Sequence, residues 1–524
     1  MTWRNYLLLA FLGLIVSLFF AHFEPFPGYL DSDYYFGGGV RLAQGKGFTE
    51  PYVWNYLDDP QALPHPSHSY WMPLASIVAA AGMIVLRQNT YAAGRLGFLV
   101  FAMLVPMITA ALAYAFSKRR DLAIVSGLLA VFSIYYAPFI PVSDNYGIYI
   151  VLGGLYFLLC MDRQPRAYFF LGLVAGLLTL ARSDGLLWIG LTVLLIVWRF
   201  ISDPSTSLRA GRKMGAASIN LVLALIGFFL IMGPWFWRNV QIYGTLLAPG
   251  GHYLLWLTNY DQTFVYPANQ LTMQSWLAQG WGNIVNVRLA ALRLNFLNAF
   301  AAQGGIFLFP FILVGAWRFR KDERVQFASV AWLGLLLVMT FIFPFAGPRG
   351  GFFHSGAALQ SVWWTLAPLG LESAISASQR RGWFTPQAFN VFRVALVGVA
   401  VLMTGFIFYL RILQPGWGED EQIYPKAETV LQQNGIKPAD VVMVRNPPGY
   451  YVMTGRSAIV IPYGDESSLL TMAKRFHARF VVIEAAGDSG PIEMIFNSKG
   501  DSSLRFLGEI SEPNNDTRIF EVQP

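Results

Sequence analysis

The feature that most constrains this chain is a series of apolar segments, each about as long as a bilayer is thick. A bilayer-spanning helix needs about 20 mostly apolar residues. Segments near that length, some shorter, are residues 6–22, 95–116, 121–138, 146–161, 167–181, 185–198, 215–234, 296–316, 327–345, 356–372 and 388–411. Only 13% of the 524 residues are charged, against about a quarter in soluble proteins. The sequence predicts a polytopic α-helical membrane protein with about 11 transmembrane helices.

Basic residues gather in short loops between these segments. They are SKRRD (117–121), DRQPR (162–166), residues 198–213, WRFRKDER (317–324) and SQRRG (378–382). Positively charged loops stay on the cytoplasmic side of a membrane. All five lie inside if the N-terminus is cytoplasmic and each segment crosses once. This topology requires that residues 71–87 do not cross, so we expect them to lie along the outer interface or to re-enter.

The same distribution excludes some classes of protein. The net charge of +7 is spread over these topology-setting loops, so a nucleic-acid partner is not expected. Cys160 is the single cysteine, which excludes an intrachain disulfide and a cysteine-based metal site. The first apolar segment lacks a convincing small-residue cleavage site, so we interpret it as an uncleaved span rather than a signal peptide. We expect a multi-pass protein of the cell (inner) membrane.

Three long segments are predicted to lie outside: residues 23–94, residues 235–295 and the tail. The tail carries short strand-like runs, DVVMVRN, SAIVIPY, ARFVVIEA and TRIFEV, between segments of helical periodicity near 424–435 and 466–477. Alternation of strands and helices indicates a small soluble α/β domain. The predicted organisation is a membrane domain over residues 1–412 and an extracytoplasmic domain over residues 413–524.

Ionisable side chains are scarce within the apolar segments and gather at their predicted outer ends. They are Asp31, Asp33, Asp144, Arg182, Asp184, Arg238 and Arg349. A transporter would be expected to place such residues near the bilayer midplane, beside broken helices. Their position here favours chemistry at the outer surface, on something that the membrane presents.

Several short motifs occur in a fixed order along residues 1–412. The pattern D-x-x-x-Y…L-x-x-G-x-G-F follows the first apolar segment, from Asp31 and Tyr35 to Phe48. The later motifs are PHPSHSYWMPL (64–74), ARSDGLL (181–187) and GPWFWRNVQIYG (233–244). Together they resemble the GT-C glycosyltransferases, especially the bacterial branch of protein O-mannosyltransferases and the aminoarabinose lipid A transferase.

That resemblance implies a function and a set of site residues. The family moves one sugar, with inversion, from a polyprenyl-phosphate carrier to a lipid, glycan or protein acceptor at the outer face. A hydroxyl acceptor needs a base, and the motif assigns that role to Asp31, with Asp33 and Asp144 as further acids. A phosphate leaving group needs cations. The predicted binding residues are Arg238, Arg349, Arg182, His68 and Tyr35. A divalent cation is left open, and the sequence requires no cofactor.

Each acid also has an alternative interpretation. Asp31 is placed as an ordinary helix cap would be. Asp33 is equally suited to orienting another group, to binding a metal or to capping the helix. Asp144 belongs to an Asp-Asn turn. The adjacent run Gly37, Gly38 and Gly39 weakens a helix by about 1 kcal/mol per glycine, which indicates either a loosened helix or a backbone that substrate approaches closely.

The basic residues have alternatives as well. Arg182 and Asp184 could satisfy each other within one turn, and Arg238 could be an anchor to lipid headgroups. His65 and His68 have a spacing compatible with zinc, but no third ligand is evident. The sequence allows two alternative functions: a transporter or flippase of lipid-linked sugars, and a non-catalytic membrane scaffold whose tail binds a partner.

Overall fold

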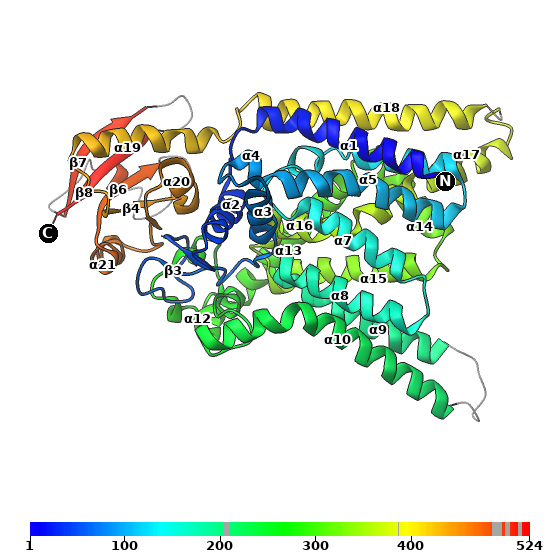
Figure 1. Cartoon of the computed structure of the whole chain (residues 1–524), viewed down its shortest axis with the longest axis horizontal. Helices are drawn as coiled ribbons and strands as arrows, with labels where there is room; N and C mark the ends of the chain where they lie inside the picture. Colours follow the sequence, from blue (N-terminus) through cyan, green and yellow to red (C-terminus); the bar gives the residue numbers. More distant parts are fainter. Residues whose placement is uncertain (203–209, 386, 485–494, 498–502, 512–515, 524) are drawn as a thin grey trace. The chain divides into compact units, whose positions relative to one another are not determined.

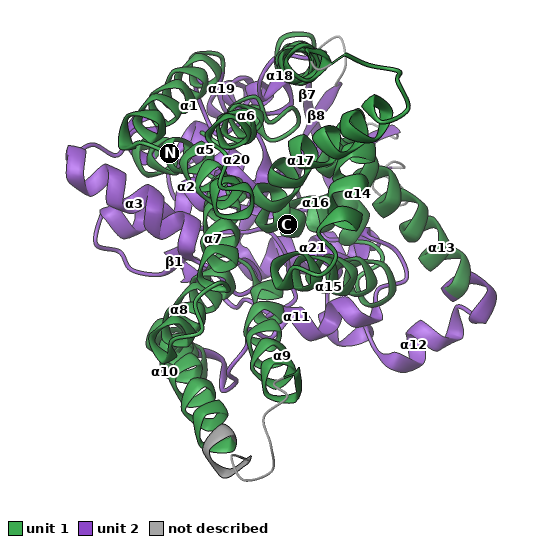
Figure 2. Ribbon diagram, turned by 90° about the vertical axis from the view of Figure 1, so that its right-hand side faces the viewer, with its two compact units in different colours: residues 1–23, 95–241, 285–414 green, residues 24–94, 242–284, 415–524 purple. Residues whose placement is uncertain are grey.

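Helices dominate the computed structural model, which describes residues 1–202, 210–385, 387–484, 495–497, 503–511 and 516–523 (Figure 1). Residues 203–209 of the predicted basic loop 198–213 lie outside this range. The chain forms two compact units (Figure 2). Unit 1 contains residues 1–23, 95–241 and 285–414, and unit 2 contains residues 24–94, 242–284 and 415–524.

Unit 1 is built almost entirely of apolar helices. Its principal helices are α1 (Trp3–Phe23), α5 (Leu96–Ser117), α6 (Arg120–Val131), α7 (Tyr146–Leu159), α8 (Pro165–Ala181), α9 (Leu186–Ser202), α10 (Ala210–Tyr243), α13 (Trp281–Asn298), α14 (Phe309–Arg318), α15 (Glu323–Leu337), α17 (Gln360–Gln379) and α18 (Ala388–Phe408). Among the described residues, 6 helical stretches are long and apolar enough to cross a membrane, and four further apolar helices are shorter. The predicted polytopic helical fold class is confirmed.

Large apolar side chains face outward along several of these helices. Leu8 on α1 is 65% exposed, Leu230 on α10 is 61% exposed and Leu402 on α18 is 73% exposed. Faces of this kind would be unfavourable in water, whereas hydrocarbon covers them at no such cost. The exposed apolar faces therefore mark the lipid-facing surface of the helices.

Within unit 1 the helices approach closely where small residues allow it. A Cβ atom added to Gly370 on α17 would overlap the carbonyl oxygen of Phe311 on α14. Gly315 on α14 faces the carbonyl of Leu366 in the same way. In lipid, burial of apolar surface does not drive helices together. Small residues at such crossings let the backbones approach, so the helices gain dispersion contacts instead.

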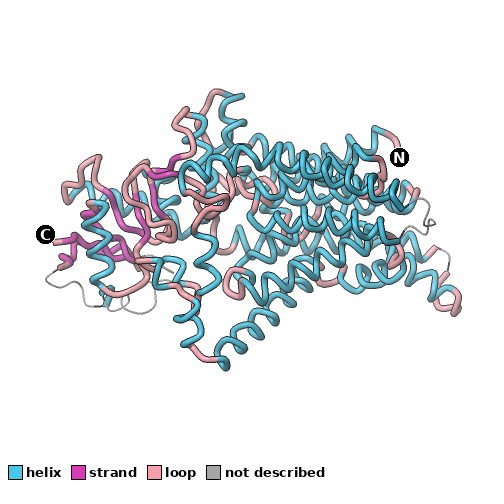
Figure 3. Tube along the Cα trace, turned by 90° about the horizontal axis from the view of Figure 1, so that it is seen from below, coloured by secondary structure: helices cyan, strands magenta, loops and turns pink. Residues whose placement is uncertain are grey.

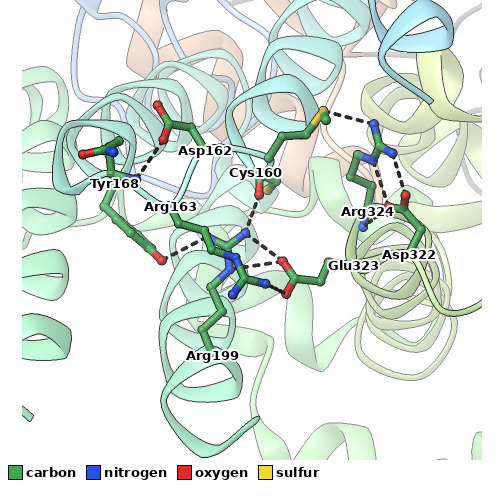
Figure 4. Close-up of polar contacts among 10 residues, drawn as sticks. Cys160, Asp162, Arg163, Tyr168, Arg199, Asp322, Glu323 and Arg324 are labelled. Atoms are coloured by element: carbon green, nitrogen blue, oxygen red, sulfur yellow. Dashed lines mark hydrogen bonds and ion pairs between the residues drawn. The ribbon is translucent and has the colours of Figure 1, made fainter. Parts of the chain in front are cut away.

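The basic loops meet in a network of ion pairs in unit 1 (Figure 4). Arg199 on α9 contacts Glu323 at 2.8 Å, and Arg163 contacts the same carboxylate at 2.6 Å. Arg199 also donates to the carbonyl of Cys160 and, at 2.9 Å, to the hydroxyl of Tyr168. The loops around residues 160–166 and 317–324 and the end of α9 therefore lie together.

The loop SKRRD joins the same end of the helices. The guanidinium carbon of Arg324 lies 3.4 Å from the ring centre of Phe116, at the end of α5. Next to it, Arg119 pairs with Glu372 near the end of α17, and Arg393 contacts Asp121 at 2.6 Å. The loops that the sequence predicted to share one side of the membrane do gather at one end of unit 1.

A six-stranded sheet forms the core of unit 2 (Figure 3). Its order is β2 (Tyr52–Val53), β5 (Ala458–Val460), β4 (Val441–Val444), β6 (Ala478–Glu484), β8 (Thr517–Val522) and β7 (Leu504–Ile510). Strands β2, β5, β4 and β6 are parallel, while β8 pairs antiparallel with β6 and β7. The four predicted strand runs are β4, β5, β6 and β8. The last residue of ARFVVIEA, at position 485, lies outside the described range.

Helices cover both faces of this sheet. On one face, α21 (Glu466–Phe476) packs Leu469 and Met472 against Met443 and Val481. On the other face, α19 (Ile423–Gln433) and α20 (Pro447–Thr454) pack against alternate residues of the same strands, including Val442. Alternate side chains of a strand point to opposite faces, so these central strands are apolar on both sides. The two helices predicted near 424–435 and 466–477 are confirmed as α19 and α21.

One strand of the sheet comes from the first predicted outer loop. β2 lies parallel to β5, with Tyr52 opposite Ala458. The hydroxyl of Tyr56 donates to the carbonyl of Val460. The loop and the tail are therefore built into one sheet, which sequence periodicity did not predict because the strand is only 2 residues long.

The first loop also contains helices α2 (Leu30–Ala43), α3 (Leu74–Leu86) and α4 (Tyr91–Gly94), and a short pair, β1 (Thr49–Glu50) with β3 (His65–Pro66). α3 has 13 residues, so it is about 20 Å long at ~1.5 Å per residue. A bilayer core is about 30 Å thick. Helices α6 and α14 of unit 1 are shorter still, so the expectation that residues 71–87 do not cross stays a prediction.

The three consecutive glycines lie inside α2, which runs through them as a regular helix. A Cβ at Gly37 would be 2.8 Å from the hydroxyl of Tyr52, and one at Gly38 would be 2.6 Å from the hydroxyl of Ser76. At Gly39 it would be 2.7 Å from the Cβ of Ala79 on α3. Of the two alternatives that the sequence left open, the structure does not show a loosened helix. The space beside these glycines is filled by other parts of the same unit.

We expect Gly39→Ala to destabilise the protein by about 1–3 kcal/mol, the usual cost of overpacking a tight contact. The new methyl group would also lie 3.2 Å from the backbone nitrogen of Ala80, and backbone cannot move aside cheaply. The measurement is thermal unfolding in detergent, followed by tryptophan fluorescence. Gly233→Ala on α10 is the matched control, because nothing lies within 4 Å of its added Cβ. Equal midpoints for the two variants would contradict the packing argument.

Candidate active site

Asp144 lies in the loop just before α7 and is fully buried. One carboxylate oxygen, Oδ1, accepts the backbone N–H of Asn145 at 2.5 Å. The other, Oδ2, lies 3.2 Å from Nε2 of His354. The positive end of a helix dipole stabilises a carboxylate at its N-terminus. The predicted acid at position 144 is therefore held on both oxygens, in a fixed orientation.

His354 belongs to α16 (Phe352–Gly356) and is held from three sides. Its Nδ1 lies 3.0 Å from the carbonyl oxygen of Gly350, so this nitrogen donates. Its ring stacks on Tyr146 with centres 4.2 Å apart and planes at 21°. Both ring nitrogens therefore have oxygen partners, which fix the orientation of the ring.

A carboxylate oxygen and an imidazole nitrogen are also donors that divalent metals accept. Unit 1 brings two of them together, Asp144 and His354. Catalytic zinc sites use three protein ligands. These two donors by themselves do not complete such a site.

The segment that supplies His354 also carries Arg349. Arg349 lies in a π-helical turn, Gly347–Gly351, and its side chain is exposed. Gly350 has φ of 120°, a conformation that residues with a Cβ rarely adopt. The glycine therefore permits the kink between the exposed arginine and the buried histidine.

The other two predicted arginines have local partners. Nε of Arg182 donates to Asp184 at 2.9 Å, as the interpretation of a self-satisfied turn expected. Arg238 on α10 is half-buried, lies 4.5 Å from the ring centre of Trp235 and donates to Asn239 at 3.2 Å. Of the three predicted arginines, Arg349 alone has an exposed side chain.

Asp31 and Asp33 both lie in the first turn of α2, in unit 2. The N-cap of this helix is Tyr29, so the interpretation of either acid as the cap is wrong. Asp31 is half-buried, whereas Asp33 is fully buried and accepts a hydrogen bond from Nδ2 of Asn446 at 3.1 Å. The two acids therefore have different surroundings, although they share one turn.

The surroundings of Asp33 raise its pKa. Loss of water on burial raises it most, and the charge of Asp31 adds to this, against the lowering effect of hydrogen bonds from Glu421 and Asn446. The result is a pKa of about 7, compared with 3.8 for an ordinary aspartate. The pKa of Glu421 is also raised, by burial and then by the charge of Asp33.

The two histidines of the first loop have separate partners in unit 2. The ring of His68 is buried between the hydroxyls of Ser67 at 2.7 Å and Ser76 at 3.1 Å. His65 lies 3.2 Å from Glu50 through one ring nitrogen and 3.2 Å from Asp58 through the other. Both nitrogens of each ring are thus engaged by these neighbours, which argues against a zinc site made by the pair.

The pKa of His65 follows from these contacts. Burial opposes its charged form, but the charge of Glu50 and the hydrogen bond with Asp58 outweigh this and raise the pKa. Tyr35, the remaining predicted binding residue, is buried on α2 with its ring centre 6.1 Å from that of Trp71.

Sequence reasoning missed three polar residues of these clusters. His354 lies five positions after Arg349, the one residue of this segment that the sequence analysis predicted. Asn446 and Glu421 belong to the tail, and Asn446 meets Asp33 across 413 positions of the chain. No local pattern could have revealed that pairing.

No model of a protein family matches the sequence, and no curated protein sequence matches it either. Solved structures do match. ArnT from Cupriavidus metallidurans, bound to undecaprenyl phosphate, matches over 98% of this chain and 97% of its own, with a TM-score of 0.56 and 12% identity. The chain has the GT-C fold. The oligosaccharyltransferase of Archaeoglobus fulgidus, in complex with Zn and sulfate, matches over 91% of this chain and 67% of its own, with a TM-score of 0.55 and 12% identity. Its apo form matches with a TM-score of 0.51 and 11% identity, over 91% and 69% of the two chains.

We expect the stability of unit 2 to fall as pH rises from about 4 to about 7. The folded pKa of Asp33, about 7, lies above its ordinary value of 3.8, so the folded state binds this proton more tightly than the unfolded chain does. The stabilisation is complete below the lower value and is lost as pH rises through the higher one. The raised pKa values of Glu421 and His65 act in the same direction.

The measurement is the unfolding midpoint in detergent between pH 4.5 and pH 8, on the wild type and on Asp33→Asn. The amide does not titrate, so the variant should show a shallower decline with pH. A decline of the same slope in both proteins would contradict the assignment of the proton to Asp33.

Proposed function

We propose that this protein is an integral membrane glycosyltransferase that takes a sugar from a polyprenyl-phosphate carrier. The single observation that carries the proposal is the match to ArnT along nearly the full length of both chains, since that structure holds undecaprenyl phosphate. The sugar passes, with inversion, to an acceptor hydroxyl at the outer face of the membrane. Residues 413–524 are proposed to form the extracytoplasmic part, and the N-terminus is proposed to be cytoplasmic.

Asp31 is the proposed general base. A hydroxyl is a weak nucleophile, so a carboxylate must take its proton as the new C–O bond forms. Asp31 suits this better than Asp33 because its side chain is only half-buried, while Asp33 is fully buried against Asn446. We therefore propose that Asp33 orients the turn that carries the base.

Asp144 is the proposed second acid of the reaction, and its pairing with His354 supports the choice. A carboxylate that is buried and held on both oxygens keeps its place while charge moves nearby. Such preorganised groups act without reorganisation at the moment of reaction. The chemistry proposed for Asp144 is to stabilise the positive charge that develops on the sugar.

The lipid phosphate needs positive charge as it leaves. Arg349 is the proposed principal contact because its guanidinium is exposed, and guanidinium can hold phosphate through two parallel hydrogen bonds. Arg238 is proposed to assist. Arg182, His68 and Tyr35 have the local neighbours described above, so we propose that they shape the binding site.

We expect Asp31→Asn to lower transfer activity by about 10²–10⁴-fold, the usual contribution of a positioned base. The assay supplies membranes with labelled polyprenyl-phosphate sugar and follows label on the acceptor and release of the free lipid phosphate. Asp59→Asn is the matched control, because Asp59 is an exposed acid of the same loop that pairs with Arg475. Full transfer by Asp31→Asn would refute the assignment, and movement of the lipid across the bilayer without transfer would support a flippase instead.

Arg349→Gln should raise the KM for the lipid donor and lower kcat/KM by about 10- to 100-fold. Each charged hydrogen bond contributes about 1.5–3 kcal/mol, and about 1.4 kcal/mol corresponds to a factor of ten. Arg320→Gln serves as the control, because Arg320 is an arginine of the basic loops that donates to the carbonyl of Trp317. Unchanged donor KM in Arg349→Gln would exclude this arginine from phosphate binding.

A further inference from the structure

Asn446 joins two buried carboxylates through a single amide group. Its Oδ1 accepts the backbone N–H of Gly449 at 3.0 Å and so caps α20. This bond fixes which end of the amide is which. The Nδ2 group, with its two hydrogens, donates to Asp33 at 3.1 Å and to Glu421 at 3.1 Å.

The three residues come from three separate elements of unit 2. Asp33 lies in the first turn of α2, Glu421 in the short helix η12 (Glu419–Gln422), and Asn446 at the start of α20. The exposed fractions of the two acids are 0% for Asp33 and 3% for Glu421. The chain just before α2 is held by the same part of the tail, since Nε1 of Trp417 donates to the carbonyl of Phe26 at 2.6 Å.

If this cluster served only to hold two elements together, it would do so at a high cost in free energy. Burying two carboxylates against each other costs more free energy than burying apolar side chains of the same size. A hydrogen-bonded polar cluster instead fixes the orientation of the groups that it joins, because its bonds form at one geometry only. Here it fixes the orientation of the first turn of α2, which also carries Asp31.

We propose that Asn446 is a positioning residue for the reaction: by holding Asp33 and Glu421, it fixes the first turn of α2 and thereby the direction of the Asp31 side chain. The inference rests on the proposed function of Asp31. Residues two apart in a helix are about 200° apart around its axis. Asp33 can therefore be anchored to the tail while Asp31 points elsewhere. On this proposal, the tail contributes to catalysis by orienting the turn that carries Asp31.

The test is a swap of amide and carboxylate. Asn446→Asp keeps the oxygen that caps α20 but replaces the donor with a third acid, so we expect kcat to fall by about 10- to 100-fold. Loss of fine positioning has effects of this size. The donor KM should stay within about twofold, because positioning acts on the chemical step rather than on binding. The double variant Asn446→Asp/Asp33→Asn places one amide between two acids again and should recover most of the lost kcat.

Two further variants keep the test decisive. Asn446→Ser retains a capping hydroxyl without adding charge, and its kcat should also fall. This variant carries the test if Asn446→Asp does not fold. Asp465→Ala removes the corresponding cap of α21, where Asp465 accepts from Ser468 at 2.9 Å, and should leave kcat unchanged. Wild-type kcat in Asn446→Ser, or a double variant no better than Asn446→Asp, would overturn the proposal.

A structural readout separates this proposal from the proposed function. Amide hydrogen exchange over residues 30–43 should be faster in Asn446→Asp and slow again in the double variant. If the wild type transfers no sugar, the proposed function fails, and exchange still shows whether Asn446 holds α2. If exchange over α2 is the same in all variants, the positioning role fails even when the wild type is active.

Discussion

Water is missing from the interior of a bilayer, so each backbone polar group there must find a partner inside the chain. Helices meet that requirement, and their apolar side chains leave no place for charge along most of their length. In unit 1 the ionisable groups are found chiefly at helix ends and in the turns between helices. The basic loops meet at one end around Arg199 and Glu323. The turn before α7 carries Asp144, and the short helix α16 carries His354, so in unit 1 the paired acid and histidine lie at the ends of longer helices rather than along them.

Turns are mobile unless something holds them, and this protein holds its polar turns with few, well-placed contacts. Asp144 is fixed by a helix N-terminus and by His354, and His354 is fixed by Tyr146 and by a carbonyl that a kink at Gly350 presents. In unit 2, specific contacts likewise hold the first turn of α2. Three glycines let α2 lie against its neighbours, and a single asparagine holds the acid at its start.

The sequence was a good guide to whatever depends on neighbours along the chain. Apolar segment length predicted most helices of unit 1. It missed α13, most of which lies in the predicted outer segment 235–295, and the predicted span 296–316 is interrupted before α14. Short strand-like runs and helical periodicity predicted four strands and two helices of the tail. The other failures concern contacts. Neither Asp31 nor Asp33 caps α2, and the three glycines of that helix, one interpretation of which was a loosened backbone, face Tyr52, Ser76 and Ala79. Local composition specifies that a glycine is small, but it does not specify which atoms use the space.

Composition and order by themselves determined that the chain is a polytopic helical membrane protein with acids and arginines between its helices, because lipid selects residue types over stretches of about 20 residues. Only the tertiary structure decided which of those residues meet. The pairing of Asp144 with His354 spans 210 positions, and that of Asp33 with Asn446 spans 413. Such pairs depend on how helices and sheet pack, and packing is a property of the whole chain rather than of any segment.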